Sequence, residues 1–195
     1  YFGGTAYLGL PTNKSFQDLV VKNILNWGTT YGSSRTANIK LKAYDEGEKF
    51  LASHISSEST VTVSSGMLAG KLVIDLMKTQ TDCFFHFNDT HNAIRIENSL
   101  PLFVNNKLNE RLLDSKQEKI AILTDGVPSF ETKPVDLSFL KQIRSHKEVT
   151  LILDESHSFG ILGGNGAGIY SSIQYPVKRK IMVSSLGKAF GLTGG

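Results

Sequence analysis

Short apolar runs recur along the chain, and each is followed by Gly, Ser or Asp and then by a helix-like stretch. This alternation is the βαβ pattern of a parallel sheet. The run at residues 149–154 is continuously apolar or β-branched, as expected for a central strand that is buried on both faces. We therefore predict an α/β fold with a mostly parallel sheet and helices on both faces. The predicted strands are residues 60–64, 83–87, 100–104, 119–124, 149–154 and 180–184.

Helical spacing of apolar residues occurs in four stretches, residues 15–26, 37–54, 66–78 and 134–146. The last of these places Leu137, Leu140 and Ile143 on one stripe. We divide the chain into an N-terminal helical segment, residues 1–55, and a large domain, residues 56–195. Because the final residues are turn-like, we expect a longer protein to continue beyond Gly195.

The charge and cysteine content exclude several classes of protein. The net charge of +3 is spread along the chain without a basic run, so nucleic-acid binding has little support. Cys83 is the only cysteine, which excludes an intrachain disulfide and a cysteine-based metal cluster and favours a reducing, cytoplasmic setting. No apolar run approaches the roughly 18 residues of a membrane span, so no membrane association is expected.

Polar residues follow four of the predicted strands, where ligands of open parallel sheets bind. Residues 64–70 form a small-residue turn that opens a helix, and free amides at a helix start suit a phosphate. His91 follows the next strand, Asp154 and His157 follow the central one, and Lys188 follows the last. Taken alone, the turn is also compatible with a plain strand-to-helix connection and His91 with a surface histidine.

Familiar nucleotide and hydrolase motifs do not account for these residues. Residues 66–71 are one residue short of a P-loop, and residues 163–168 lack the spacing of a dinucleotide-binding loop. Residues 185–188 match S-x-x-K, but the companion β-lactamase motifs are absent. An amine, an anion, an imidazole and a phosphate-binding turn together suit pyridoxal phosphate, whose aldehyde, ring nitrogen and phosphate require such partners.

The same residues resemble the α-oxoamine synthase family of fold-type I pyridoxal-phosphate enzymes, which includes 8-amino-7-oxononanoate synthase and glycine C-acetyltransferase. The resemblance extends from residue 7 to residue 195 and is most specific at residues 154–160 and 184–195. Aminotransferases of this fold generally have a tyrosine where His157 stands, which favours the oxoamine synthase branch. The resemblance implies the large domain of an aspartate-aminotransferase-like fold, with the C-terminal small domain absent from this chain.

The resemblance also implies a role for each candidate residue. Lys188 would hold the cofactor as a Schiff base and move the substrate α-proton, and Asp154 would pair with the pyridinium nitrogen. His157, helped by Ser129, would bond the phenolic oxygen. The remaining cofactor-binding residues would be His91, stacked on the ring, and the phosphate contacts Gly66, Met67, Leu68 and Ser185. No metal is expected.

The implied activity is a pyridoxal-phosphate-dependent acyl transfer in which an amino acid condenses with an acyl-CoA to give an aminoketone. Members of the family are homodimers with the active site at the interface, so a homodimer is expected. One alternative is an aminotransferase, or another enzyme that transforms amino acids without CoA. A second is a catalytically silent partner subunit, against which the presence of Lys188 argues.

Overall fold

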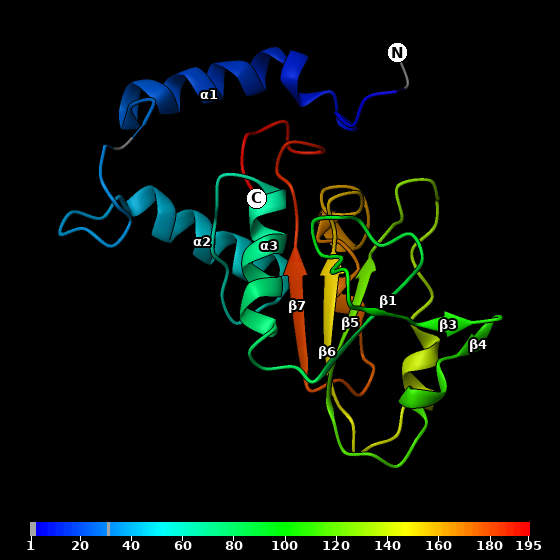
Figure 1. Cartoon of the computed structure of the whole chain (residues 1–195). Coiled ribbons are helices and arrows are strands. Elements are labelled where there is room, and N and C mark those ends of the chain that lie inside the picture. Colours follow the sequence, from blue (N-terminus) through cyan, green and yellow to red (C-terminus); the bar gives the residue numbers. More distant parts are fainter. Residues whose placement is uncertain (1–2, 31) are drawn as a thin grey trace.

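A computed structural model describes residues 3–30 and 32–195 of the chain (Figure 1). Tyr1, Phe2 and Tyr31, which belong to the predicted segment 1–55, lie outside the described residues. The structure contains a five-stranded sheet in the order β2-β1-β5-β6-β7, in which every neighbouring pair is parallel. Its strands are β1 (Cys83–His86), β2 (Leu100–Pro101), β5 (Lys119–Asp125), β6 (Glu148–Asp154) and β7 (Arg179–Val183). The predicted α/β fold with a mostly parallel sheet is confirmed.

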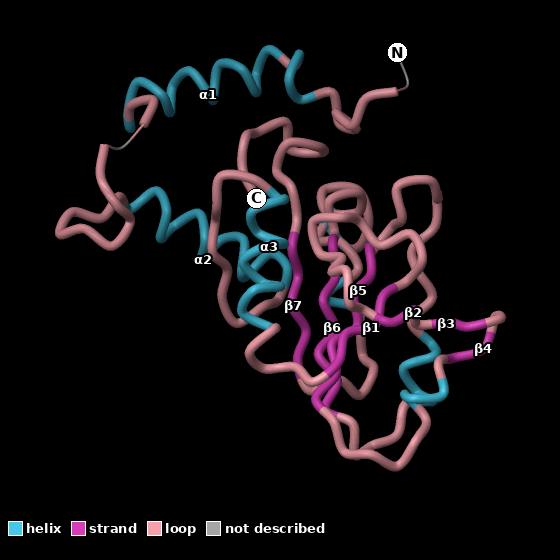
Figure 2. Tube along the Cα trace, in the orientation of Figure 1, coloured by secondary structure: helices cyan, strands magenta, loops and turns pink. Residues whose placement is uncertain are grey.

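The central strands β5 and β6 are buried on both faces, so their side chains alternate between two apolar clusters. Leu123 and Ile152 pack on one face against Ile74 and Met77 of α3 (Gly66–Met77). The opposite face is covered by two short 3-10 helices, Ser138–Gln142 and Tyr170–Ser172, and the loops around them. Figure 2 shows these loops beside the strands.

Two further helices precede α3, and capping fixes where the first begins. In α1 (Lys14–Trp27), the Asn13 side chain accepts the backbone N–H of Phe16, which satisfies one of the unpaired amides of the first turn. No side chain of α1 is buried, and Figure 1 draws this helix beyond the arrowheads of the sheet. The next helix, α2 (Lys42–Ile55), buries only Ala52 and Ile55.

Four element predictions need correction. Residues 60–64 form no strand, although Val63 and Gly195 exchange a pair of backbone hydrogen bonds. Residues 134–146 contain the short 3-10 helix in place of an α-helix. Residues 100–104 divide between β2 and β3 (Phe103–Val104), which pairs antiparallel with β4 (Lys107–Leu108). The helix predicted from residue 37 begins at Lys42.

Among the described residues, no helix is long and apolar enough to cross a bilayer.

Candidate active site

The carboxyl ends of β5, β6 and β7 bring the predicted chemical groups to one edge of the sheet. Asp125 and Asp154 end neighbouring strands and are register partners, and Asp154 in turn faces Val183. Lys188 lies five residues after Val183, in the loop that follows β7. These side chains therefore lie at the edge of the sheet where ligands of open parallel sheets bind.

His157 stands at the centre of this group. Its Nε2 lies 2.9 Å from the Nζ of Lys188 and 3.3 Å from the Oγ of Ser129. Its Nδ1 lies 2.6 Å from the hydroxyl oxygen of Tyr7, a residue that the sequence analysis did not select. Burial lowers the pKa of the His157 ring, and the neighbouring Lys188 charge lowers it further. The ring is therefore held neutral.

Lys188 itself sits in a partly buried, acidic setting. Burial lowers the pKa of its amine below the ordinary lysine range, while Asp154 and Asp125 act in the opposite direction. A depressed lysine pKa raises the fraction of neutral amine at neutral pH. That form is the nucleophile that attacks a carbonyl group.

Asp154 and His91 approach each other from β6 and the loop after β1. Asp154 Oδ1 accepts the Ser156 N–H at 2.9 Å, and Oδ2 lies 3.9 Å from the Nδ1 of His91, which is too long for a hydrogen bond. His91 Nδ1 already accepts the backbone N–H of Ala93 at 3.2 Å, which leaves the ring proton on Nε2. The two side chains are adjacent but do not form a hydrogen-bonded ion pair.

Asp125 is a second carboxylate that the sequence analysis did not name as a site residue. Its side chain is buried, and Oδ1 accepts the backbone N–H of His91 at 3.0 Å. Among the described residues, its Oδ2 is the one fully buried side-chain oxygen without a hydrogen-bond partner. Burial and the nearby Asp154 charge raise the pKa of Asp125 to about 7. The strand-end rule that selected Asp154 applies equally to Asp125 and could have found it.

The turn predicted to bind the phosphate lies at the start of α3. Ser65 Oγ accepts the N–H of Leu68, so that amide is already used by the helix cap. No side chain of the described residues caps the amides of Gly66 and Met67 in this way. A Cβ on Gly66 would lie 2.9 Å from the backbone of Ser185, so only glycine allows this close approach. Ser185 donates its N–H to Ser156 Oγ, which ties the two loops together. All of the predicted phosphate contacts therefore lie close to one another.

Known proteins are similar to this chain over nearly its whole length, although no family model matches it. The chain is 28% identical over 200 residues to the 8-amino-7-oxononanoate synthase of Petrotoga mobilis, covering 97% of this chain and 51% of that protein. The solved 8-amino-7-oxononanoate synthase of Francisella tularensis matches 99% of this chain and 56% of its own, with a TM-score of 0.68 and 27% identity. The chain is related to the α-oxoamine synthases.

A third comparison concerns the fold alone. Serine palmitoyltransferase of Sphingomonas wittichii matches 99% of this chain and 51% of its own with a TM-score of 0.77, at 19% identity. The architecture is accordingly that of the large domain of fold-type I enzymes. The chain spans about half the length of the curated α-oxoamine synthases that it matches.

The glycine-rich loop after His157 is anchored by a buried carboxylate. Glu155, fully buried, accepts the backbone N–H of Ile169 at 2.9 Å and of Tyr170 at 2.7 Å, as well as the hydroxyl of Ser158. A Cβ on Gly168 would lie 2.6 Å from the same carboxylate. Because Glu155 adjoins Asp154 in sequence, the loop and the site are held by one short segment.

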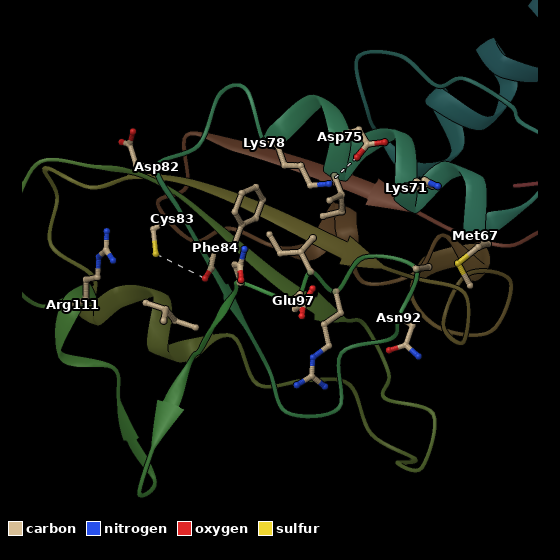
Figure 3. Close-up of a pocket in the computed structure, with 16 residues that line it drawn as sticks. Met67, Lys71, Asp75, Lys78, Asp82, Cys83, Phe84, Asn92, Glu97 and Arg111 are labelled. Carbon is tan, nitrogen blue, oxygen red and sulfur yellow. Dashed lines mark hydrogen bonds and ion pairs between the residues drawn. The ribbon is translucent and has the colours of Figure 1, made fainter.

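A cavity of about 700 Å³ opens elsewhere, beside α3 and residues 92–98 (Figure 3). Of the predicted site residues, Met67 lines it, and the close-up shows Lys78 turned toward Asp75, with which it forms a 2.9 Å ion pair. The cluster around His157 is separate from this cavity, since none of its charged side chains lines it.

Proposed function

We propose that the chain binds pyridoxal 5′-phosphate, with Lys188 as the amine that attaches to the cofactor aldehyde. The observation that carries this proposal is the grouping of Lys188, His157 and Asp154 around one strand edge, with the lysine amine 2.9 Å from the His157 ring. The unpartnered buried oxygen of Asp125 also supports it, because such an atom is costly unless a polar or cationic group approaches it.

The acidic residues would hold the cofactor ring in its reactive form. Asp154 would pair with the ring nitrogen, and a charge pair at about 4 Å contributes roughly 4 kcal/mol at an effective dielectric of about 20. His91, next to Asp154, would lie on the ring face. His157 and Ser129, which already share a contact, would bond the phenolic oxygen.

The phosphate would be held where α3 begins. The amides of Gly66 and Met67 would donate to it together with the Ser185 hydroxyl, and the positive end of the helix dipole favours an anion there. The predicted contact of Leu68 would be made by a part of the residue other than its capped amide, since Ser65 Oγ already accepts that N–H.

The reaction that we propose is the condensation of an amino acid with an acyl-CoA to an aminoketone. When bound, the cofactor acts as an electron sink that stabilises negative charge on the substrate α-carbon. Lys188 would take up and return the proton at that carbon, for which its depressed pKa suits it. The relatives named 8-amino-7-oxononanoate synthase, which share sequence across nearly all of this chain, support this choice.

We further propose that the chain works as a homodimer in a reducing, cytoplasmic setting. The exposed apolar residues of α1, among them Leu19, Ile24 and Trp27, would be covered by a second copy. The buried free thiol of Cys83 is compatible with a reducing compartment.

The cofactor proposal is tested by titrating the purified chain with pyridoxal phosphate and recording its visible absorption. Wild type should gain an absorption band, and borohydride reduction followed by peptide mass spectrometry should find the pyridoxyl group on Lys188. Lys188→Ala should lose both signals, whereas Lys49→Ala, at an exposed position of α2, should keep them. A band that persists in Lys188→Ala would refute the assignment.

The substrate proposal needs a separate assay. Glycine, serine and alanine are supplied with and without an acyl-CoA, and the products are identified by mass spectrometry. An aminoketone formed only with acyl-CoA supports the acyltransferase. An oxo acid formed without it would favour the aminotransferase alternative, and cofactor binding without turnover would favour the silent partner subunit.

A further inference from the structure

The N-terminal segment reaches the candidate site across 150 residues of sequence. The hydroxyl oxygen of Tyr7 lies 2.6 Å from His157 Nδ1, and the two ring centroids are 6.1 Å apart. This contact is supported by a second one a few residues further along, where a Cβ on Gly191 would lie 3.0 Å from the ring of Pro11. The segment therefore packs on the loop that carries Lys188. Its Tyr7 contacts Nδ1 of His157, whereas Lys188 contacts Nε2.

Hydrogen-bonding rules fix the direction of these contacts. A protonated lysine amine only donates, so Nε2 of His157, 2.9 Å from Lys188 Nζ, must accept when that amine is charged. The ring, held neutral by burial and by the Lys188 charge, then carries its single proton on Nδ1. That proton points at Tyr7, whose oxygen accepts it.

A phenol is a suitable partner for an imidazole whose proton must move from one ring nitrogen to the other. Once Lys188 is attached to a cofactor, as we propose above, Nε2 would have to donate to the phenolic oxygen, and the ring proton would move to it. Nδ1 then needs a donor in place of an acceptor. The tyrosine hydroxyl supplies both functions, whereas a carbonyl or an ammonium group supplies only one.

We infer that Tyr7 is a positioning residue for His157, holding the imidazole in place through Nδ1 in either tautomer. The tautomer protonated on Nδ1 follows from residues of this chain alone. The tautomer protonated on Nε2 rests on the proposed function. The hydroxyl stays protonated at neutral pH because burial raises the pKa of Tyr7 further above its ordinary value. The charged or titratable groups that act on the His157 ring are Lys188, Asp154 and His91.

The first test uses the cofactor-free wild-type chain and needs no substitution. Nitrogen-15 shifts of its histidine rings, measured at a pH where Lys188 is charged, should show His157 as the single tautomer protonated on Nδ1. A spectrum in which His157 carries its proton on Nε2 would overturn the assignment of Tyr7 as the acceptor of the ring proton in the cofactor-free chain, whatever the chain does with pyridoxal phosphate. The result is thus independent of the outcome for the proposed function.

The second test is Tyr7→Phe, which removes only the hydroxyl from a residue that is 45% exposed. The tautomer itself should persist, because the charged Lys188 amine still requires Nε2 to accept. The nitrogen-15 shift of Nδ1 should change as its proton loses its acceptor, and pyridoxal phosphate should bind about fivefold more weakly, as expected for one lost hydrogen bond. Tyr44→Phe is the matched control, because Tyr44 contacts Arg35 through its ring face, which phenylalanine keeps. His157 shifts that are the same in Tyr7→Phe and wild type would show that Tyr7 has no positioning role.

Discussion

Asp125 and Asp154 face each other as register partners at the carboxyl ends of β5 and β6. Two carboxylates on neighbouring strands repel each other, and burial disfavours charge on either. The two carboxylates have different surroundings. Burial and the Asp154 charge raise the pKa of Asp125 to about 7, whereas Oδ1 of Asp154 accepts the Ser156 N–H. Asp125 of the cofactor-free chain therefore keeps its proton up to about pH 7.

This pair makes the stability of the cofactor-free chain depend on pH. In the unfolded chain Asp125 loses its proton near its ordinary pKa of 3.8, whereas in the folded chain it keeps it up to about pH 7. Over that window the unfolded state binds fewer protons, so stability falls as pH rises, by up to about 1.4 kcal/mol per unit. Asp125→Asn cannot ionise and can still accept the His91 N–H. We expect it to be more stable than wild type at pH 8 and to have no advantage at pH 4.

Urea unfolding of the cofactor-free chain at the two pH values measures this difference. Asp18→Asn, on the exposed surface of α1, is the control and should show no comparable dependence on pH. An equal gain for Asp125→Asn at both values would mean that the carboxylate does not titrate in this range.

Glu155 should hold the glycine-rich loop in place. Glu155→Ala leaves the amides of Ile169 and Tyr170 without their acceptor, at a cost of about 1–3 kcal/mol for each unsatisfied group. Hydrogen exchange at these two amides should accelerate in the variant and the unfolding free energy should fall. Glu131→Ala, at an exposed position, should change neither quantity. Unchanged protection of Ile169 and Tyr170 in Glu155→Ala would contradict this role.

A charged network at the opposite edge of the sheet gives another prediction. Buried Glu118 contacts Arg111, Lys116 and Lys147 at 2.6, 2.9 and 3.0 Å, and the Lys147 side chain is fully buried. Arg111 and the two lysines hold the pKa of Glu118 well below its usual range, so its contribution is present above the ordinary glutamate pKa and is lost as pH falls. Glu118→Ala removes one of the two carboxylates that contact the buried Lys147 amine and leaves Asp114, at 2.6 Å, as the other, so we expect a loss of about 1–3 kcal/mol.

Chemical denaturation at pH 7 checks this loss against an exposed ion pair. Asp75→Ala breaks the ion pair between Asp75 and Lys78, in which both side chains are about half exposed. It should lower the free energy of unfolding by less than about 1 kcal/mol. Similar losses for the two variants would show that burial does not make the Glu118 network special.

The four main strands could be predicted because their signal is local. β1, β5 and β6 are mostly apolar and buried, and β7 is partly buried. The observed bounds of all four differ from the predicted ones by no more than one residue. Residues 60–64 have a similar pattern, but a strand also requires neighbours, and here only Val63 and Gly195 exchange backbone bonds. The stripe of Leu137, Leu140 and Ile143 repeats every three residues, a spacing that fits a 3-10 helix as well as an α-helix.

The candidate site divides in the same way between local and distant signals. Lys188 and Asp154 are marked by their places just after buried strands, and Asp125 carries the same signal. Tyr7 carries none, because its contact with His157 depends on how a segment 150 residues away folds back over the site. No spacing within the sequence encodes such an approach.

Two glycines in neighbouring helices should respond oppositely to the same substitution. Gly47 in α2 has open space where a Cβ would stand, so Gly47→Ala should stabilise the chain by about 0.5–1 kcal/mol through helix propensity. In α3 a Cβ on Gly70 would lie 2.4 Å from the backbone oxygen of Ala93, which cannot rotate away. Gly70→Ala should therefore destabilise the chain by about 1–3 kcal/mol despite the same gain in propensity. Urea denaturation of both variants decides the matter, and stabilisation by Gly70→Ala would mean that α3 does not pack this closely on residue 93.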